Sequence, residues 1–199
     1  MSMINISGII TTKIERSHEV LGEKFYKFNL ASQRLSGNMD IIPCIASEVL
    51  VANLNTDDEV TLIGDIRTRN VEVEGQTRKR LDVFVFVTEI GEYIPNKNHV
   101  EITGYICKEP VYRETPLNRQ ICDIFVAVNR AYHKSDYIPC ICWGRNAIKA
   151  SYLEIGEKVT LLGRLQSREY VKGDVTKVTY EVSANCLTLD DEEIGEDVE

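Results

Sequence analysis

The segment Asp136–Ile141 reads DYIPCI, and the segment Asp40–Ile45, which lies 96 residues earlier, reads DIIPCI. Three further pairs of segments repeat in the same order: Ile4–Ile10 with Val100–Ile106, Phe28–Arg34 with Ile124–Arg130, and Glu59–Arg69 with Lys158–Arg168. The offset is 96 residues in the first two of these pairs and 99 residues in the last. Self-similarity in a fixed order indicates a duplicated domain. We therefore expect two copies of one fold, named copy one and copy two from here on.

The expected domain boundaries follow from the repeat. The join GEYIPNKNH (Gly91–His99) carries the Gly, Pro and Asn that are typical of turns. It separates copy one (residues 1–92) from copy two (residues 99–189) by a short linker (residues 93–98). Residues 190–199 hold seven acidic residues and no basic one, which is typical of a solvated, disordered tail.

Most segments of each copy alternate polar and apolar residues or are rich in β-branched residues, which predicts strands. One segment per copy predicts a helix, residues 47–58 in copy one and 144–156 in copy two. Five strands with a helix between the third and the fourth describe an OB-fold, a five-stranded Greek-key barrel. An SH3-like barrel is the alternative, but it has no helix at that place. The predicted fold is therefore all-β with one short helix per domain, arranged as two tandem OB-folds.

The composition narrows the class of protein. Of the 199 residues, 43% are hydrophobic and 27% are charged, as in soluble globular proteins. No apolar run reaches the ~18–20 residues of a membrane span, and the first ten residues do not have the pattern of a signal peptide. We therefore expect a cytoplasmic protein that does not bind a membrane.

The sequence does not favour catalysis or a cofactor. The six cysteines form no C-x-x-C pair and the three histidines are scattered, which argues against a zinc or redox site. The sequence also lacks a nucleophile–base pairing and a phosphate-binding glycine loop, so we expect neither an enzyme nor a bound cofactor. The net charge is −8, yet residues 96–189 carry 13 Lys and Arg against 10 Asp and Glu, whereas residues 1–95 carry 10 against 14. An anion-binding surface is therefore expected in copy two.

Copy two resembles the bacterial single-stranded DNA-binding protein family. The resemblance rests on ITGYICKEPVYRETP, FVAVNRAY, DYIPCICWG and YLEIGEKVTLLGRLQSREY, which follow one another in the family's order. Copy one is similar more faintly, through FNLASQR, IIPCI and TLIGDIRTR. Two copies look like the tandem-domain members of the family, so the resemblance implies single-stranded DNA as partner and a homodimer with four OB domains. It also implies recruitment of replication or repair proteins by the acidic tail, although the family's terminal Pro-Phe is missing here.

Binding of a single strand requires aromatic faces for the bases and cations for the phosphates. The resemblance implies that Tyr132, Tyr137, Trp143 and Tyr170 are the stacking residues. The two-residue period of a strand places Tyr137, Pro139, Ile141 and Trp143 on one face, and Arg164, Gln166, Arg168 and Tyr170 on one face of a later strand. The residues predicted to contact nucleic acid are Tyr132, Tyr137, Trp143, Tyr170, Arg168, Arg164, Arg145, Arg130, Lys134, Lys172 and Lys177.

In copy one the four aromatic positions hold Ser36, Ile41, Ser47 and Val71. We therefore expect copy one to be a structural or pairing domain, with phosphate contacts at most from Arg67, Arg69 and residues 76–81. The leading hypothesis is a non-enzymatic, sequence-independent single-stranded DNA binder that acts in replication, repair or recombination. The alternative is a primosome-type OB-fold protein that mainly bridges other proteins. An OB-fold hydrolase or a tRNA-binding accessory domain is a third interpretation.

Overall fold

The computed structural model describes residues 1–72, 79–172 and 175–189, without the side chains of residues 171, 172, 175 and 176. The predicted acidic tail (190–199) and part of the basic segment 76–81 lie outside these residues. The chain divides into two compact units. The copy-one unit contains Met3–His99 together with Leu165–Glu181, and the copy-two unit contains Met1–Ser2, Val100–Arg164 and the residues from Val182 onward. Residues 165–181 are thus part of copy two in the sequence repeat but belong to the copy-one unit.

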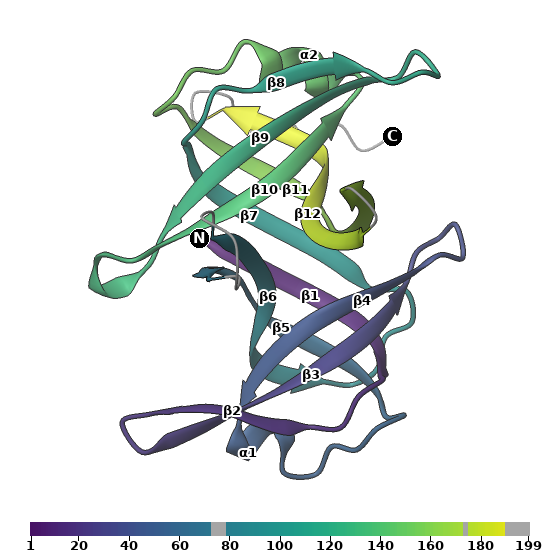
Figure 1. Ribbon diagram of the computed structural model, residues 1–199, viewed down its shortest axis with the longest axis vertical. Helices are drawn as coiled ribbons and strands as arrows, with labels where there is room; N and C mark the ends of the chain where they lie inside the picture. The colour runs from purple at the N-terminus through teal and green to yellow at the C-terminus, as the bar shows by residue number, and fades with distance from the viewer. Residues whose placement is uncertain (73–78, 173–174, 190–199) are drawn as a thin grey trace. The chain divides into compact units, whose positions relative to one another are not determined.

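The barrel of copy two is formed by five strands: β7 (Asn98–Ile106), β9 (Gln120–Asn129), β10 (Ser135–Trp143), β11 (Lys158–Lys172) and β12 (Val175–Leu189). β7 pairs antiparallel with β9 and with β11, and β9 pairs antiparallel with β10. β10 runs parallel to β12, which neighbours β11, so the circuit of strands closes. The helix α2 (Arg145–Ser151) follows β10 and contacts β9 and β10 at one end of this barrel (Figure 1).

The barrel of copy one repeats this order with β1 (Ser2–Ile10), β3 (Glu23–Gln33), β4 (Met39–Ser47), β5 (Glu59–Val71) and β6 (Arg80–Gly91). β1 pairs with β3 and β5, β3 with β4, and β5 with β6, all antiparallel, while β4 and β6 are parallel. The helix α1 (Glu48–Val51) again stands between the third and fourth barrel strands. The predicted fold of two tandem OB-folds is confirmed.

Each copy also has a short strand that the sequence analysis does not predict. β2 (Glu15–Val20) pairs with the outer part of β3, and β8 (Val111–Glu114) pairs with β9. A single-turn 3₁₀ segment, η1 (Ala131–His133), lies between β9 and β10. The helices are shorter than predicted: α2 ends at Ser151 rather than near residue 156, and α1 ends at Val51.

The barrels close tightly at two equivalent glycines. A side chain at Gly8 of β1 would clash with the carbonyl oxygen of Ala31, and one at Gly104 of β7 would clash with that of Ala127. These glycines are 96 residues apart, so both copies require the same close approach of backbones. Along β11, Val159, Leu161 and Leu165 are buried, on the face opposite the one predicted to carry Arg164, Gln166, Arg168 and Tyr170.

Candidate nucleic-acid interface

The outward face of β10 carries two exposed aromatic rings. Tyr137 and Trp143 are 47% and 37% exposed, while Ile138, Cys140 and Cys142 between them point into the barrel. This confirms the two faces predicted from the alternation of the strand. Ile141, which the alternation also places on the outward face, is only 2% exposed.

Trp143 is oriented by a hydrogen bond to a neighbouring strand. The indole Nε1 of Trp143 donates a hydrogen bond to Oγ of Ser183 at 3.0 Å. Ser183 lies on β12 as the parallel neighbour of Ile141. The indole therefore reaches across from β10 toward β12, and the hydrogen bond fixes the orientation of the ring. Ile45, the counterpart of Ile141 in copy one, is also buried although Ser47 stands in place of the tryptophan, so the burial of Ile141 does not require the indole. Gly144 follows with φ +54°, and Arg145 is exposed at the start of α2.

A third outward ring comes from β9. Phe125 is the cross-strand neighbour of Pro139, so it lies between the levels of Tyr137 and Trp143 on the same face of the β9–β10 pair. Nζ of Lys108 lies 4.0 Å from the centroid of its ring, a cation–π contact. Neither residue is among the predicted contacts, although Phe125 alternates with Ile124 and Val126, which are buried, and the period of the strand therefore places Phe125 outward.

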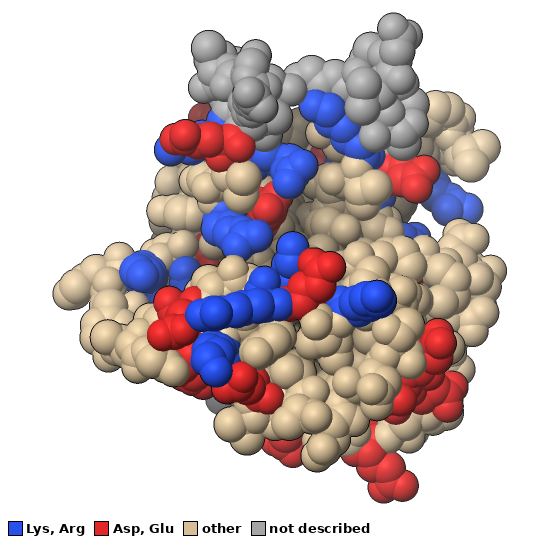
Figure 2. Space-filling model, turned by 60° about the horizontal axis from the view of Figure 1, so that its bottom comes forward, with Lys and Arg blue, Asp and Glu red and all other residues tan. Residues whose placement is uncertain are grey.

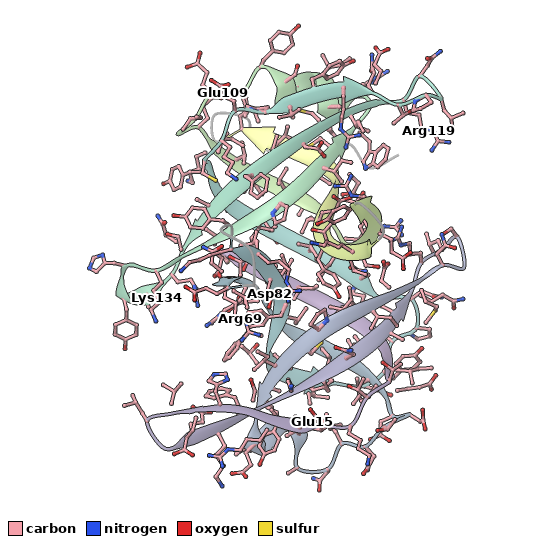
Figure 3. All side chains as sticks on the ribbon, viewed as in Figure 1. Glu15, Arg69, Asp82, Glu109, Arg119 and Lys134 are labelled. Carbon is pink, nitrogen blue, oxygen red and sulfur yellow. The ribbon has the colours of Figure 1, made fainter. Side chains whose placement is uncertain are left out.

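The loop between β9 and β10 presents Tyr132 almost entirely to solvent. Tyr132 is 91% exposed and has φ +60°, and His133 has φ +54°. Lys134 extends from the same projecting loop (Figure 3). Arg130, which was predicted to contact nucleic acid, pairs with Asp136: its Nε lies 2.7 Å from Oδ2 of that carboxylate, whose side chain is 1% exposed. The charge of Arg130 is therefore used to satisfy a buried carboxylate.

The predicted site residues fall in both compact units. The copy-two unit holds Tyr132, Tyr137, Trp143, Arg145, Arg130, Lys134 and the half-buried Arg164. The copy-one unit holds Arg168, Tyr170, Lys172 and Lys177. Tyr170 is exposed and Lys177 is half-buried, whereas the side chain of Lys172 lies outside the described residues. Nε of Arg168 lies 3.4 Å from Oε2 of the buried Glu181, so part of its charge is already balanced.

Copy one has outward rings of its own, at other positions. Arg67 lies 4.1 Å over the ring of Phe86, and Arg69 lies 5.4 Å over that of Phe84. The two guanidinium groups are in turn close to Asp65 (3.3 Å) and Asp82 (3.7 Å), and Figure 3 shows Arg69 beside Asp82. On the end of the molecule that carries α1 and β2, basic side chains are interspersed with acidic ones rather than gathered in one patch (Figure 2).

The cysteines of β9 and β10 lie inside the barrel. Burial raises the pKa of Cys142 to about 12 and that of Cys122 to about 11, so both thiols stay protonated at neutral pH. Within the described ranges, no three His, Cys, Asp or Glu side chains gather in a way that could hold a metal ion. In the same ranges no helix has the length and apolar character needed to cross a membrane.

Known proteins are similar in sequence to copy two. Residues 97–190 match the model of the single-strand binding protein family. The single-stranded DNA-binding protein of Bacillus cereus is 34% identical over 88 residues, which are 41% of this chain and 52% of that protein. Single-stranded DNA-binding protein 1 of Staphylococcus aureus is 35% identical over 80 residues, 37% of this chain and 48% of that protein. Copy two is therefore similar to the single-strand binding protein family over nearly its whole length.

This match confirms the resemblance found in the sequence. The chain spans about half the length of the curated relatives it matches, and the match covers copy two. The similarity of fold extends further. The crystal structure of the wild-type single-stranded DNA binding protein from Thermus aquaticus superposes with a TM-score of 0.76 at 19% identity, covering 97% of this chain and 94% of that one. The tandem arrangement of two OB-folds is therefore shared with a protein of that name.

Proposed function

We propose that copy two binds single-stranded DNA by stacking bases on the outward face of β9 and β10. The observation that carries the proposal is the pair of exposed rings, Tyr137 and Trp143, on one face of a strand in a barrel that matches the model of the single-strand binding protein family. They are six residues apart, which corresponds to about 20 Å along a strand. One base cannot contact both rings, so a bound nucleic acid runs along β10.

Phe125 and Lys108 complete this surface. Phe125 lies opposite Pro139, between the levels of the two exposed rings and nearer to Tyr137. Lys108 is exposed, and its ammonium group is attached through a flexible stem. A base that stacks on Phe125 displaces Lys108 from the ring, and the displaced ammonium group then reaches a phosphate of the same strand. Tyr132, Arg145 and Lys134 extend the contact at the ends of β10. Arg168 and Tyr170, which belong to the other compact unit, are proposed as separate contacts to nucleic acid on β11.

Stacking does not discriminate strongly between bases, because every base has an aromatic face. The binding is therefore largely independent of sequence. Its role is to hold exposed strands and to prevent their reannealing during replication, repair or recombination. We also propose that two chains associate so that four barrels act together, which is supported by the resemblance to tandem-domain members of the family. Sedimentation of the full chain at the mass of one chain would contradict this association.

The function is tested by titrating the full chain with oligo-dT and following the fluorescence of Trp143, which is the single tryptophan of the chain. We expect strong quenching at low salt. The logarithm of the binding constant should decrease with the logarithm of the salt concentration, with a slope of about −0.7 per neutralised phosphate. A folded protein that shows neither quenching nor binding at low salt would overturn the proposal and favour the bridging alternative.

A further inference from the structure

A salt bridge of copy one holds the backbone of β11. Arg34 donates two hydrogen bonds to the carboxylate of Asp40, from Nε at 2.7 Å and from Nη2 at 2.6 Å. The same carboxylate accepts hydrogen bonds from the backbone N–H of Ser167 at 2.7 Å and from its hydroxyl at 2.8 Å. Nη2 of Arg34 also donates to the carbonyl oxygen of Ser167 at 2.6 Å. All three polar groups of Ser167 are therefore bound by one ion pair.

This arrangement is buried and electrostatically satisfied. The side chain of Asp40 is 1% exposed and that of Arg34 is 25% exposed. Burial by itself raises the pKa of Asp40, but the hydrogen bonds from Arg34 and Ser167 outweigh it and lower the pKa below its ordinary value. The hydrogen bond to Asp40 raises the pKa of Arg34. Charge-assisted hydrogen bonds of this kind are stronger than neutral ones, so Ser167 is held more firmly than an ordinary strand residue.

Ser167 lies directly beside residues of the proposed interface. Because side chains alternate along a strand, Ser167 points to one face while Arg168 and Tyr170 point to the other. On that other face, Glu181 of β12 contacts Arg168 at 3.4 Å and accepts a hydrogen bond from Nε2 of Gln166 at 3.1 Å. The segment is thus fixed from both sides, by Asp40 on one and by Glu181 on the other.

The ion pair occurs in both copies. Arg130 and Asp136, 96 residues after Arg34 and Asp40, form the same buried pair between the second and third barrel strands of copy two. The pair is therefore a feature of the duplicated domain. In copy one it contacts Ser167, a residue of the other copy in the sequence repeat.

We propose that the Arg34–Asp40 pair of copy one positions the nucleic-acid-binding segment of β11, so that copy one contributes to binding by holding Arg168 and Tyr170 in place. Asp40 and Arg34 are positioning residues in this proposal, because they act through Ser167. The inference rests on the proposed function of copy two and deepens it. It assigns copy one a part in binding that does not require base-stacking residues at Ser36, Ile41 and Ser47.

The test is a double-mutant cycle on the full chain with oligo-dT as the probe. Asp40→Asn keeps the shape of the side chain and removes its charge, and we expect it to weaken binding about tenfold. Ser167→Ala removes one hydrogen bond, and we expect a loss of about threefold. In a background with Arg168→Gln and Tyr170→Ala, the same two substitutions should change the affinity by less than about twofold, because the groups they position are absent.

Two further measurements separate positioning from general destabilisation. Hydrogen exchange of the Ser167 amide should be faster in the Asp40→Asn variant, while exchange of buried amides elsewhere in β4 stays slow. Asp65→Asn is the matched control, since Asp65 pairs with Arg67 in the same copy but does not contact Ser167. This variant should bind oligo-dT as the parent does. If the Asp40→Asn variant does not fold, the cycle is measured with Ser167→Ala as the only positioning substitution.

The outcomes also distinguish this inference from the proposed function. Full additivity in the cycle, or unchanged affinity in both the Asp40→Asn and Ser167→Ala variants, overturns the positioning role. Trp143→Ser is measured in parallel. If that substitution leaves the affinity unchanged, the proposed stacking function of copy two is wrong, whatever the result at Asp40.

Discussion

Copy one and copy two each form a barrel of the same fold, but the aromatic rings on the outside of the two barrels differ in what covers them. In copy two, Tyr137 and Trp143 are exposed and the ring of Phe125 is covered by a single flexible ammonium group. In copy one, the rings of Phe86 and Phe84 lie beneath guanidinium groups that are close to acidic side chains. A planar guanidinium that stacks on a ring and also pairs with a carboxylate leaves that face closed to a base. The same fold can therefore present either an open or a closed aromatic surface.

The largest expected effect concerns the two exposed rings. Replacing both Tyr137 by Ala and Trp143 by Ser removes two stacking contacts of about 1–3 kcal/mol each. We expect binding of oligo-dT to weaken by about 30-fold or more, as measured by fluorescence anisotropy of a labelled oligonucleotide. The matched change in copy one, Ile41→Ala with Ser47→Ala, should alter the affinity by less than about twofold. An equal loss in the two variants would contradict the division between the copies.

Phe125 gives a sharper form of the same comparison. Phe125→Ser removes the ring between Tyr137 and Trp143, and we expect a loss of affinity of about five- to tenfold. Phe84→Ser removes an Arg-covered ring of copy one and should leave the affinity unchanged. Isothermal titration with oligo-dT measures both. If Phe84→Ser weakens binding as strongly as Phe125→Ser, the covered rings of copy one also contact the strand.

A substitution of Lys108 tests whether its ammonium group leaves the ring of Phe125 and contacts a phosphate when nucleic acid binds. In Lys108→Gln we expect only a small loss of affinity at low salt, because the bare ring of Phe125 remains available for stacking. The salt dependence should become shallower by about 0.7 in slope, since one phosphate contact is lost. Lys27→Gln in copy one, which affects a pair with Glu15, serves as control and should leave the slope unchanged. An unchanged slope in Lys108→Gln would show that the ammonium group stays on the ring.

The smallest expected effect is that of pH on the hydrogen bonds between Asp40 and Ser167. A carboxyl group whose folded pKa is lowered stabilises the folded state above its unfolded pKa, about 3.9 for Asp. That stabilisation is lost as the pH falls through the lowered folded pKa. The hydrogen bonds to Ser167 should therefore be unaffected between about pH 6 and 8 and should weaken only in acid below about pH 4. Amide exchange at Ser167 as a function of pH checks this, and a transition near neutral pH would contradict it.

The fold was accessible to sequence reasoning because both copies carry the same pattern. The repeats predicted two equal barrels, and the alternation of β10 predicted that Tyr137 and Trp143 point outward while Cys140 and Cys142 point inward. Such alternation is a local property of a strand, so it can be read without knowledge of neighbouring strands.

Contacts between distant segments could not be predicted in this way. The indole of Trp143 donates its hydrogen bond to Ser183, forty residues away. The pair of Arg130 with the buried carboxylate of Asp136 spans only six residues, yet no period or motif in the sequence indicates that this cation has a partner. Ser167 donates a hydrogen bond to Asp40, which lies 127 residues earlier in the sequence, and no period or motif indicates this contact. Phe125 differs from these cases, because the alternation of β9 was sufficient to identify it.

The contact between Asp40 and Ser167 has a consequence for the order of events during synthesis. Copy one leaves the ribosome first, but the carboxylate of Asp40 receives its last two hydrogen-bond donors only after 127 more residues have been made. At bacterial-scale elongation of about 5–20 residues per second, this interval lasts roughly 6 to 25 s. During that time the carboxylate of Asp40 lacks its two hydrogen bonds from Ser167. The N-terminal barrel therefore reaches its full stability only after β11 has been synthesised.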